Sequence, residues 1–166
     1  YSSYQTCPRR WKLKYIDKIK DDQPSIHAVF GTSMHTVIQH WLQVMFLETV
    51  KKSEELNFDQ LLLTELKSNY AKDVERYKKH FSTKEELTEF YLDGLETLKY
   101  LRKKRKVYFD RQNQELVGTE IPILIQPIQE FSNVFLNGFL DLVLKDKKGP
   151  KFYILDLKTS TRGWKD

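Results

Sequence analysis

Two apolar segments near the C-terminal end of the chain contain charged side chains. Residues 138–144 read GFLDLVL and contain Asp141, and residues 154–158 read ILDLK and contain Asp156 and Lys158. The surrounding Phe, Leu, Ile and Val residues are typical of strands that are covered on both faces. Because an unpaired buried carboxylate is strongly unfavourable, such groups are usually paired, neutralised or bound to a metal. These segments therefore constrain both the fold and the chemistry of the chain.

Strand geometry brings these charges together. Residues i and i+2 of a strand project to the same side, so Asp156 and Lys158 are predicted to lie together, and Asp141 joins them if the two strands are neighbours. Carboxylate oxygens on rigid strands suit Mg²⁺ or Mn²⁺. A neighbouring ammonium group can orient an attacking water or stabilise developing negative charge. The alternative is a structural ion pair, or a strand end that reaches solvent.

The pattern of the whole chain predicts helices first and strands later. Apolar residues at helical spacing predict helices over residues 2–16, 32–52, 57–80 and 83–106. Segments rich in β-branched and aromatic residues predict strands over residues 117–125, 134–144 and 152–157. Turn-forming residues at 145–150 predict an antiparallel hairpin between the last two strands. The chain is therefore predicted to be an α/β (α+β) layered domain with a helical N-terminal half and a strand-rich C-terminal half.

Composition limits the class of protein. A length of 166 residues fits one domain, and a hydrophobic content of 40% supports a packed core. The net charge of +5 suits a polyanionic ligand, although many basic proteins bind no nucleic acid. The single cysteine, Cys7, excludes an internal disulfide and favours an intracellular protein of the cytoplasm or nucleoid. An organellar location or a phage origin stays open. The longest apolar stretch, residues 37–50, is too short and too polar to span a bilayer, so no membrane association is expected.

His35 is a second candidate for metal binding. It comes early in the long predicted helix, and helical spacing places it on a face with Ile38, Leu42 and Phe46. It is therefore predicted to point inward. A histidine in this position can face a cleft and ligate a metal, or it can be a core residue with one ring nitrogen hydrogen-bonded.

Glu120 lies within the first predicted strand. Pro122 follows it closely, and proline is typical of an edge strand because it cannot donate to the sheet. A metal-facing role and a solvent-facing position are both open for Glu120.

Basic clusters at residues 8–15, 78–79 and 102–106 are possible nucleic-acid contacts. In the first, Arg9, Arg10 and Trp11 combine cations with an aromatic ring, which suits phosphates and stacked bases. The last lies at a predicted helix C-terminus, where cations are favourable for the helix dipole alone. Most such runs are solvated surface.

Four segments, taken in order, carry a family resemblance. Residues 3–11 resemble a signature of Ser, then Cys-Pro-x-x-aromatic, and residues 31–35 resemble Gly-Thr-x-x-His. Residues 138–141 resemble Gly-x-x-Asp, and residues 156–160 resemble Asp-x-Lys-Thr-small. This ordered set resembles the RecB-like branch of the PD-(D/E)XK nuclease superfamily, which includes AddB and the CRISPR-adaptation nucleases.

The resemblance implies a fold and a set of site residues. The fold would be a restriction-endonuclease-like mixed β-sheet flanked by α-helices. Lys158 would be the catalytic lysine, and Glu120 resembles a glutamate often found in the strand before Gly-x-x-Asp. Thr159 and Ser160 would be further candidates for contact with nucleic acid. The expected ligands of the divalent cation are His35, Asp141, Asp156 and the backbone carbonyl of Leu157.

The implied function is hydrolysis of phosphodiester bonds in DNA with Mg²⁺ or Mn²⁺. Such an enzyme would be an exonuclease of DNA recombination, repair or replication, acting on single-stranded DNA or DNA with free ends, with a helicase or recombination protein as a possible partner. The alternative is a catalytically inactive nucleic-acid-binding or helicase-docking domain with the same fold. Such a binding module should bind DNA equally well in EDTA and form no products.

Two features of the family are not expected within this chain. Some relatives hold an iron–sulfur cluster with four cysteines, but Cys7 cannot supply four ligands, and we interpret it as a small buried packing residue. Members commonly have a Gln-x-x-x-Tyr helix after the lysine motif. Residues 1–166 are therefore expected to form a single PD-(D/E)XK nuclease domain that stops before this last helix.

Overall fold

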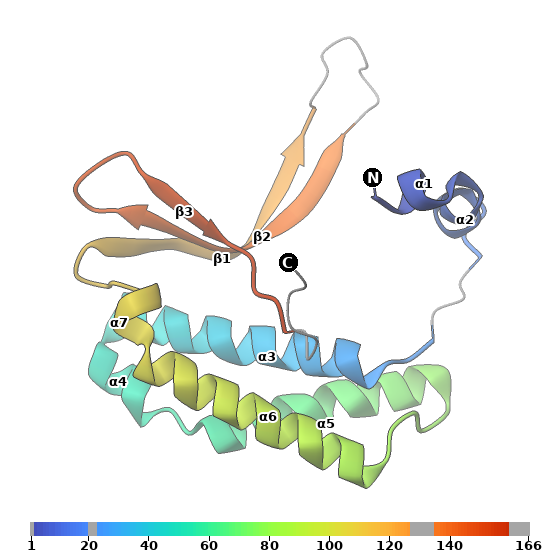
Figure 1. The fold of residues 1–166 in the computed structure, drawn as a ribbon, viewed down its shortest axis with the longest axis horizontal. Helices are drawn as coiled ribbons and strands as arrows, with labels where there is room; N and C mark the ends of the chain where they lie inside the picture. The colour runs from blue at the N-terminus through green and yellow to red at the C-terminus, as the bar shows by residue number, and fades with distance from the viewer. Residues whose placement is uncertain (1, 20–22, 127–134, 160–166) are drawn as a thin grey trace.

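The computed structural model describes residues 2–19, 23–126 and 135–159, and within them a layer of helices lies on one face of a three-stranded sheet (Figure 1). The helices are α1 (Ser2–Thr6), α2 (Pro8–Trp11), α3 (Ile26–Gln43), α4 (Val50–Glu55), α5 (Phe58–Tyr77), α6 (Lys84–Lys103) and α7 (Arg105–Tyr108), with π-helical turns η1 (Lys12–Ile16) and η2 (Val44–Glu48). The strands are β1 (Gln114–Ile125), β2 (Leu136–Asp146) and β3 (Phe152–Leu155). The predicted α+β class, helical first and strand-rich later, is confirmed.

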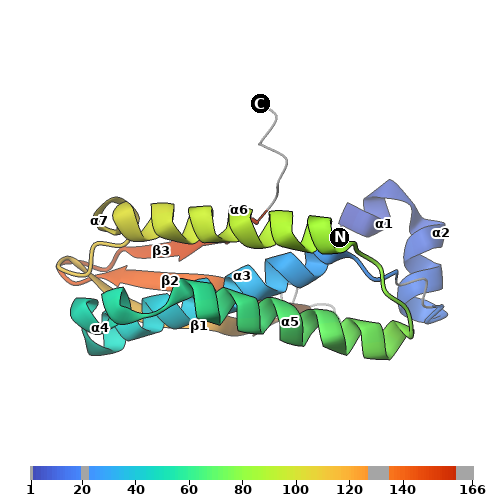
Figure 2. The ribbon, with the colours of Figure 1, turned by 90° about the horizontal axis from the view of Figure 1, so that it is seen from below.

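Helix α3 is the centre of the helical layer, and α5 and α6 lie along it (Figure 2). It contains no Asp, Glu, Lys or Arg, and its buried face enters the core together with Leu62 of α5 and Leu98 of α6. α3 begins at Ile26 and not at residue 32 as predicted. Gly31 therefore lies inside the helix, where a Cβ atom would come within 3.1 Å of Thr159 Oγ1. Gly31 is thus a point of close approach by a segment distant in the sequence.

Gly94 allows α6 to approach its neighbours closely. A Cβ atom at this position would lie 2.7 Å from Leu62 Cδ2 and 3.1 Å from Met34 Sδ. Both of these side chains are almost completely buried, so neither has free space to move into. Glycine in the middle of a helix normally costs about 1 kcal/mol relative to alanine, and the close packing of α3, α5 and α6 offsets that cost.

The sheet has the order β1-β2-β3, and both pairs of strands are antiparallel. Within the described residues, the predicted mixed sheet therefore has antiparallel pairs only. The predicted hairpin between the last two strands is confirmed, with Asp146 N donating to Lys151 O across its turn at 2.8 Å. The outer part of the β1–β2 hairpin turns away from the helical layer (Figure 1).

Only one face of the described sheet is fully covered. Leu142 and Leu144 of β2 are fully buried and belong to the core cluster formed with the helices. On the other face, Phe152 and Ile154 of β3 are 54% and 63% exposed. The prediction that both apolar segments are strands covered on both faces is therefore wrong for β3 in the part of the chain that the structure describes. Alternation of side chains across a strand permits one dry face and one open face, and apolar composition alone does not distinguish the two arrangements.

Candidate metal centre

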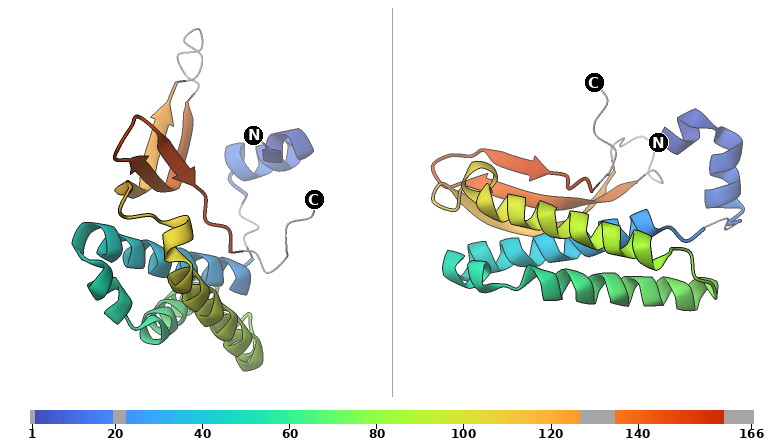
Figure 3. Two further views of the ribbon diagram at one scale, coloured as in Figure 1. Left: turned by 60° about the vertical axis from the view of Figure 1, so that its left-hand side comes forward. Right: turned by 60° about the horizontal axis from the view of Figure 1, so that its bottom comes forward.

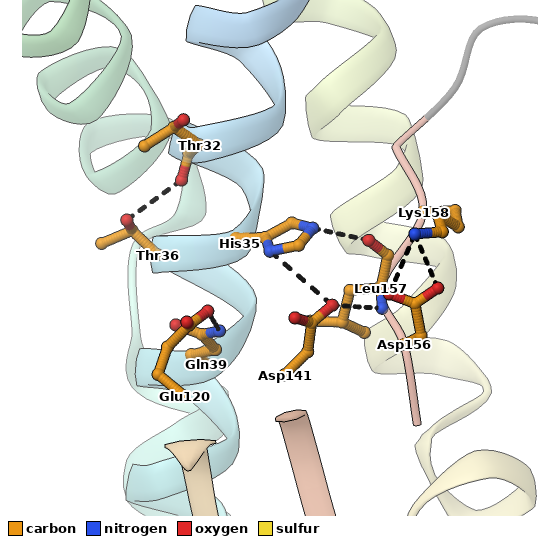
Figure 4. Close-up of polar contacts among 9 residues, drawn as sticks. All are labelled: Thr32, His35, Thr36, Gln39, Glu120, Asp141, Asp156, Leu157 and Lys158. Carbon is orange, nitrogen blue, oxygen red and sulfur yellow. Dashed lines mark hydrogen bonds and ion pairs between the residues drawn. The ribbon is translucent and has the colours of Figure 1, made fainter. Parts of the chain in front are cut away.

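His35 projects from α3 toward the segment that follows β3 (Figure 4). Its Nε2 atom lies 2.6 Å from the backbone oxygen of Leu157, and its Nδ1 atom lies 3.9 Å from Asp141 Oδ2. A carbonyl oxygen can only accept a hydrogen bond, so Nε2 is the protonated nitrogen in this contact. In the neutral form of the ring the lone pair of Nδ1 then faces Asp141, and this is the form in which a histidine can ligate a metal.

Asp141 and Leu157 are joined through the backbone. Leu157 N donates to Asp141 Oδ2 at 2.7 Å, while Leu157 O contacts His35. The backbone N–H and C=O groups of Leu157 are therefore both in contact with side chains of the candidate site. β3 accordingly ends at Leu155 and not at residue 157 as predicted, because the next residues leave the strand ladder to make these contacts.

Glu120 completes the group from β1. It lies between the strand pairs Thr119↔Leu142 and Ile121↔Leu140, so that it stands opposite Asp141. Its φ angle is +49°, in the left-handed region that residues other than glycine rarely adopt. The carboxylate is exposed, and its Oε1 atom accepts a hydrogen bond from Gln39 Nε2 of α3 at 2.7 Å. β1 is an edge strand of the described sheet, as Pro122 predicted.

One ligand atom each from His35, Glu120 and Asp141 lies within 4.8 Å of the other two. In an octahedral site with bonds of about 2.1 Å, neighbouring and opposite ligands are roughly 3 to 4.2 Å apart. Two carboxylate oxygens and one imidazole nitrogen are therefore close to the spacing that a small divalent cation needs. The oxygen donors of this set favour a hard cation of the magnesium or manganese type.

Asp156 and Lys158 form an ion pair beside this group. Lys158 Nζ lies 2.7 Å from Asp156 Oδ2, and both side chains are more than half exposed. The hydrogen bond and charge of Lys158 lower the pKa of Asp156, with smaller contributions from Asp141 and His35. Asp156 in turn raises the pKa of Lys158 by the same hydrogen bond and charge. At neutral pH Asp156 is therefore a carboxylate and Lys158 an ammonium ion.

The family model described as the PD-(D/E)XK nuclease superfamily matches residues 1–166, which is the whole chain. The chain belongs to the PD-(D/E)XK nuclease superfamily. A search of curated proteins finds no significant match.

Nucleases of the PD-(D/E)XK superfamily use divalent metal ions, and the chain carries a histidine and carboxylate group suited to one. Membership implies nuclease chemistry in general, with nucleic acid as its substrate. The predicted residues His35, Asp141 and Glu120 meet in this PD-(D/E)XK domain, and Leu157 joins two of them. Asp156 and Lys158 lie alongside, in the extended segment beyond β3.

Other predicted contacts of this nuclease domain lie elsewhere. Arg9, Arg10 and Trp11 belong to α2, which stands apart from the helical layer in Figures 1 and 3. The two arginines are exposed, and the ring of Trp11 packs 5.3 Å from that of Tyr4. Thr159 is half-buried beside Gly31. Ser160 lies outside the described residues.

Cys7 differs from its interpretation as a buried packing residue. It is only half-buried, and its Sγ atom accepts a hydrogen bond from Arg10 N at 3.4 Å, which caps the start of α2. A thiol is a weak acceptor, so sequence preferences for capping residues did not identify it.

Part of the basic cluster at residues 102–106 has a structural role. Arg102 Nη2 donates to Leu56 O at 2.7 Å, and its guanidinium lies 3.6 Å from the centre of the Phe58 ring. Burial lowers the pKa of Arg102. Arg105 pairs with Glu54 at 3.1 Å. These two arginines therefore stabilise the junction of α4, α5 and α6, and neither is a free phosphate contact.

Gln39 and Gln43 were not predicted from the sequence as residues near the site. Gln39 contacts Glu120, and Gln43 Nε2 donates to Thr119 Oγ1 at 2.7 Å. The sequence pattern that could have indicated them is their spacing, since they are polar residues one and two turns after His35 on a helix without Asp, Glu, Lys or Arg.

No helix in the described part of the chain has the length and apolar character needed to cross a membrane.

Proposed function

We propose that the protein is a divalent-metal-dependent deoxyribonuclease that hydrolyses phosphodiester bonds. The observation that carries the proposal is the convergence of His35, Glu120 and Asp141 from α3, β1 and β2 in a chain of the PD-(D/E)XK superfamily. α3 is far from β1 and β2 in the sequence. Two carboxylates this close repel each other, and a divalent cation between them would remove that repulsion.

Each residue has a role in this proposal. His35 Nδ1 and the carboxylates of Asp141 and Glu120 hold the cation, with Asp156 and the Leu157 carbonyl as further candidate ligands. A bound Mg²⁺ or Mn²⁺ would lower the pKa of a coordinated water and stabilise negative charge on the phosphate. Lys158 is an ammonium ion and so acts as a hydrogen-bond donor and point charge toward the attacking water or a phosphate oxygen. Asp156 holds Lys158 beside the site until substrate arrives.

The proposed branch of the superfamily, and the proposed substrate and partner, follow from the four sequence motifs described above. Their order supports the RecB-like branch, with its relatives AddB and the CRISPR-adaptation nucleases, and an exonuclease of recombination, repair or replication. The substrate would be single-stranded DNA or DNA with free ends, with Arg9, Arg10, Trp11, Thr159 and Ser160 as contacts. A helicase or recombination protein would be the partner, inside the cell. Residues 1–166 would form one nuclease domain.

The test is cleavage of end-labelled single- and double-stranded DNA with Mn²⁺, Mg²⁺ or EDTA. Asp141→Asn and Lys158→Met should each remove several kcal/mol of transition-state stabilisation, which slows cleavage roughly 10³-fold. Asp93→Asn and Lys99→Met make the same chemical changes on the exposed surface of α6 and should cleave at the wild-type rate. Metal-independent DNA binding without products would instead favour the inactive binding domain.

A further inference from the structure

We propose that Gln39 is a positioning residue that holds the Glu120 carboxylate in the metal centre. The inference rests on the proposed function and deepens it. It assigns the positioning of the candidate ligand Glu120 to α3, the helix that also carries the candidate ligand His35. Gln39 Nε2 donates to Glu120 Oε1 at 2.7 Å, and Gln39 lies one helical turn after His35 on α3.

Glu120 needs such a partner. Its side chain is exposed and long, so a free carboxylate there would sample many rotamers and lose entropy on binding a cation. Its backbone has the positive φ angle of +49°, a conformation that costs on the order of 1 to 3 kcal/mol for residues other than glycine. Strain of this kind persists only where neighbouring contacts determine the conformation. The hydrogen bond from Gln39 is one such contact.

The register of the sheet explains how Glu120 reaches α3. The pairing of β1 with β2 shifts between Leu116 and Gly118, which leaves Val117 as an extra residue in β1. An irregularity of this kind re-aims the side chains that follow it. Thr119 and Glu120 are consecutive, and both contact α3, although consecutive strand residues normally point to opposite faces.

The chemistry of the amide suits a metal site. A lysine or arginine in place of Gln39 would neutralise the carboxylate and repel an incoming cation. An amide N–H orients one carboxylate oxygen without adding charge and leaves the other lone pairs for coordination. α3 has no Asp, Glu, Lys or Arg along its whole length, so its polar face near the site carries none of these charged side chains. Hydrogen-bonded partners of metal ligands typically affect metal affinity by about 10- to 100-fold.

Gln43 provides the internal comparison. Its Nε2 atom donates to Thr119 Oγ1 at 2.7 Å, which is the same length as the bond from Gln39 to Glu120. It anchors β1 to α3 one turn further along, but it contacts a hydroxyl and not a candidate ligand. If Gln39 only anchors β1, then loss of either amide should have the same effect on the metal centre.

The experiment measures Mn²⁺ binding without DNA, from the loss of the electron paramagnetic resonance signal of free Mn²⁺. Wild type, Gln39→Met, Gln43→Met and His35→Ala are compared, with thermal unfolding measured on each. Methionine has nearly the length of glutamine but no donor. Gln39→Met should weaken Mn²⁺ binding about 10- to 100-fold. Gln43→Met should weaken it by a clearly smaller factor while lowering thermal stability to a similar extent.

A second readout is the Mn²⁺ concentration that gives half-maximal DNA cleavage. For Gln39→Met this concentration should rise, and saturating Mn²⁺ should restore most of the cleavage rate, because only the placing of a ligand is lost. Equal weakening of Mn²⁺ binding by Gln39→Met and Gln43→Met would overturn the inference and leave the proposed function intact. Failure of the wild type to bind Mn²⁺, or unchanged binding by His35→Ala, would overturn the metal centre itself and the inference with it.

Discussion

The two faces of α3 are built from contacts of different kinds. The buried face packs Met34, Trp41 and Leu42 into the core with residues of α5 and α6, and each of these side chains is at most 1% exposed. The adjoining face carries His35 and Gln39, which contact single polar groups after β3 and on β1. One face stabilises the fold by burying apolar side chains, and the other makes directional hydrogen bonds to groups of the candidate site.

The difference teaches which contacts are replaceable. Apolar burial is non-directional, so similar side chains can substitute for one another if their volume is kept. A hydrogen bond to a candidate ligand depends on the position of a particular donor within a few tenths of an ångström. We therefore expect substitutions on the buried face to change stability and substitutions on the polar face to change metal binding. Leu42→Ala and Gly31→Ala on α3 test this separation, and Gly94→Ala on α6 tests the packing of the buried face.

The largest stability effect is expected from Leu42→Ala on the buried face. Leu42 is 0% exposed, and its loss should reduce the free energy of unfolding by about 2 to 5 kcal/mol through lost burial and the cavity left behind. Urea unfolding measures the change, and DNA cleavage per folded molecule should remain at the wild-type level. A folded Leu42→Ala protein of normal stability that cleaves poorly would contradict the separation.

Gly94→Ala should destabilise the helical layer by less. Alanine favours the helix by about 1 kcal/mol, but overpacking a close contact typically costs about 1 to 3 kcal/mol. The new methyl group would meet the buried Leu62 at 2.7 Å, so the packing cost should win. The double variant Gly94→Ala with Leu62→Ala lacks the closest of the contacts that the methyl group would make. Urea unfolding of the two single variants and the double variant forms a double-mutant cycle. If the two losses in the free energy of unfolding simply add, the contact between the new methyl group and Leu62 is not the cause of the destabilisation.

Gly31→Ala should have the smallest effect on stability and a larger one on cleavage. The new methyl group would lie 3.1 Å from Thr159 Oγ1, at the end of a half-buried side chain that can move slightly. The gain in helix propensity, about 1 kcal/mol, should offset most of this cost. Cleavage should fall because Thr159 directly follows Lys158.

The control for this prediction removes the obstructing hydroxyl. Cleavage by Gly31→Ala with Thr159→Ala should equal that of Thr159→Ala alone, since no clash remains. A cleavage rate for Gly31→Ala equal to that of wild type would show that α3 does not set the position of the lysine segment.

Much of the fold could be predicted because it depends on local patterns. The spacing of apolar residues gave α5 and α6 closely, and turn residues gave the β2–β3 hairpin. The predicted end of β3 was wrong because the segment after β3 returns to α3, where Leu157 bonds to Asp141 and His35. The predicted start of α3 was wrong because Gly31 is accommodated inside the helix, beside Thr159. The contact between His35 and Leu157 joins residues 122 positions apart, and contacts of this range leave no local pattern.

For the candidate site, the sequence identified most residues but not their arrangement. Asp141 was recognised as a charge within an apolar strand and His35 from its place early in the long predicted helix. For Glu120 a metal-facing role and a solvent-facing position were both open. The π-helical turn η2, the shifted register near Gly118 and the partners Gln39 and Gln43 were not predicted. Glutamine is common on helix surfaces, and only the position of β1 distinguishes these two from others.

The sequence by itself determined the class of the fold, the helices and strands, and the residue types that can bind a divalent cation, because propensity, periodicity and chemistry are properties of short segments. The tertiary structure decided which of those residues meet. It placed His35, Glu120 and Asp141 within 4.8 Å of one another and left Asp156 paired with Lys158 beside them. The physical reason is that the closeness of these groups depends on packing between α3 and the sheet, which share one core through Leu142 and Leu144 of β2.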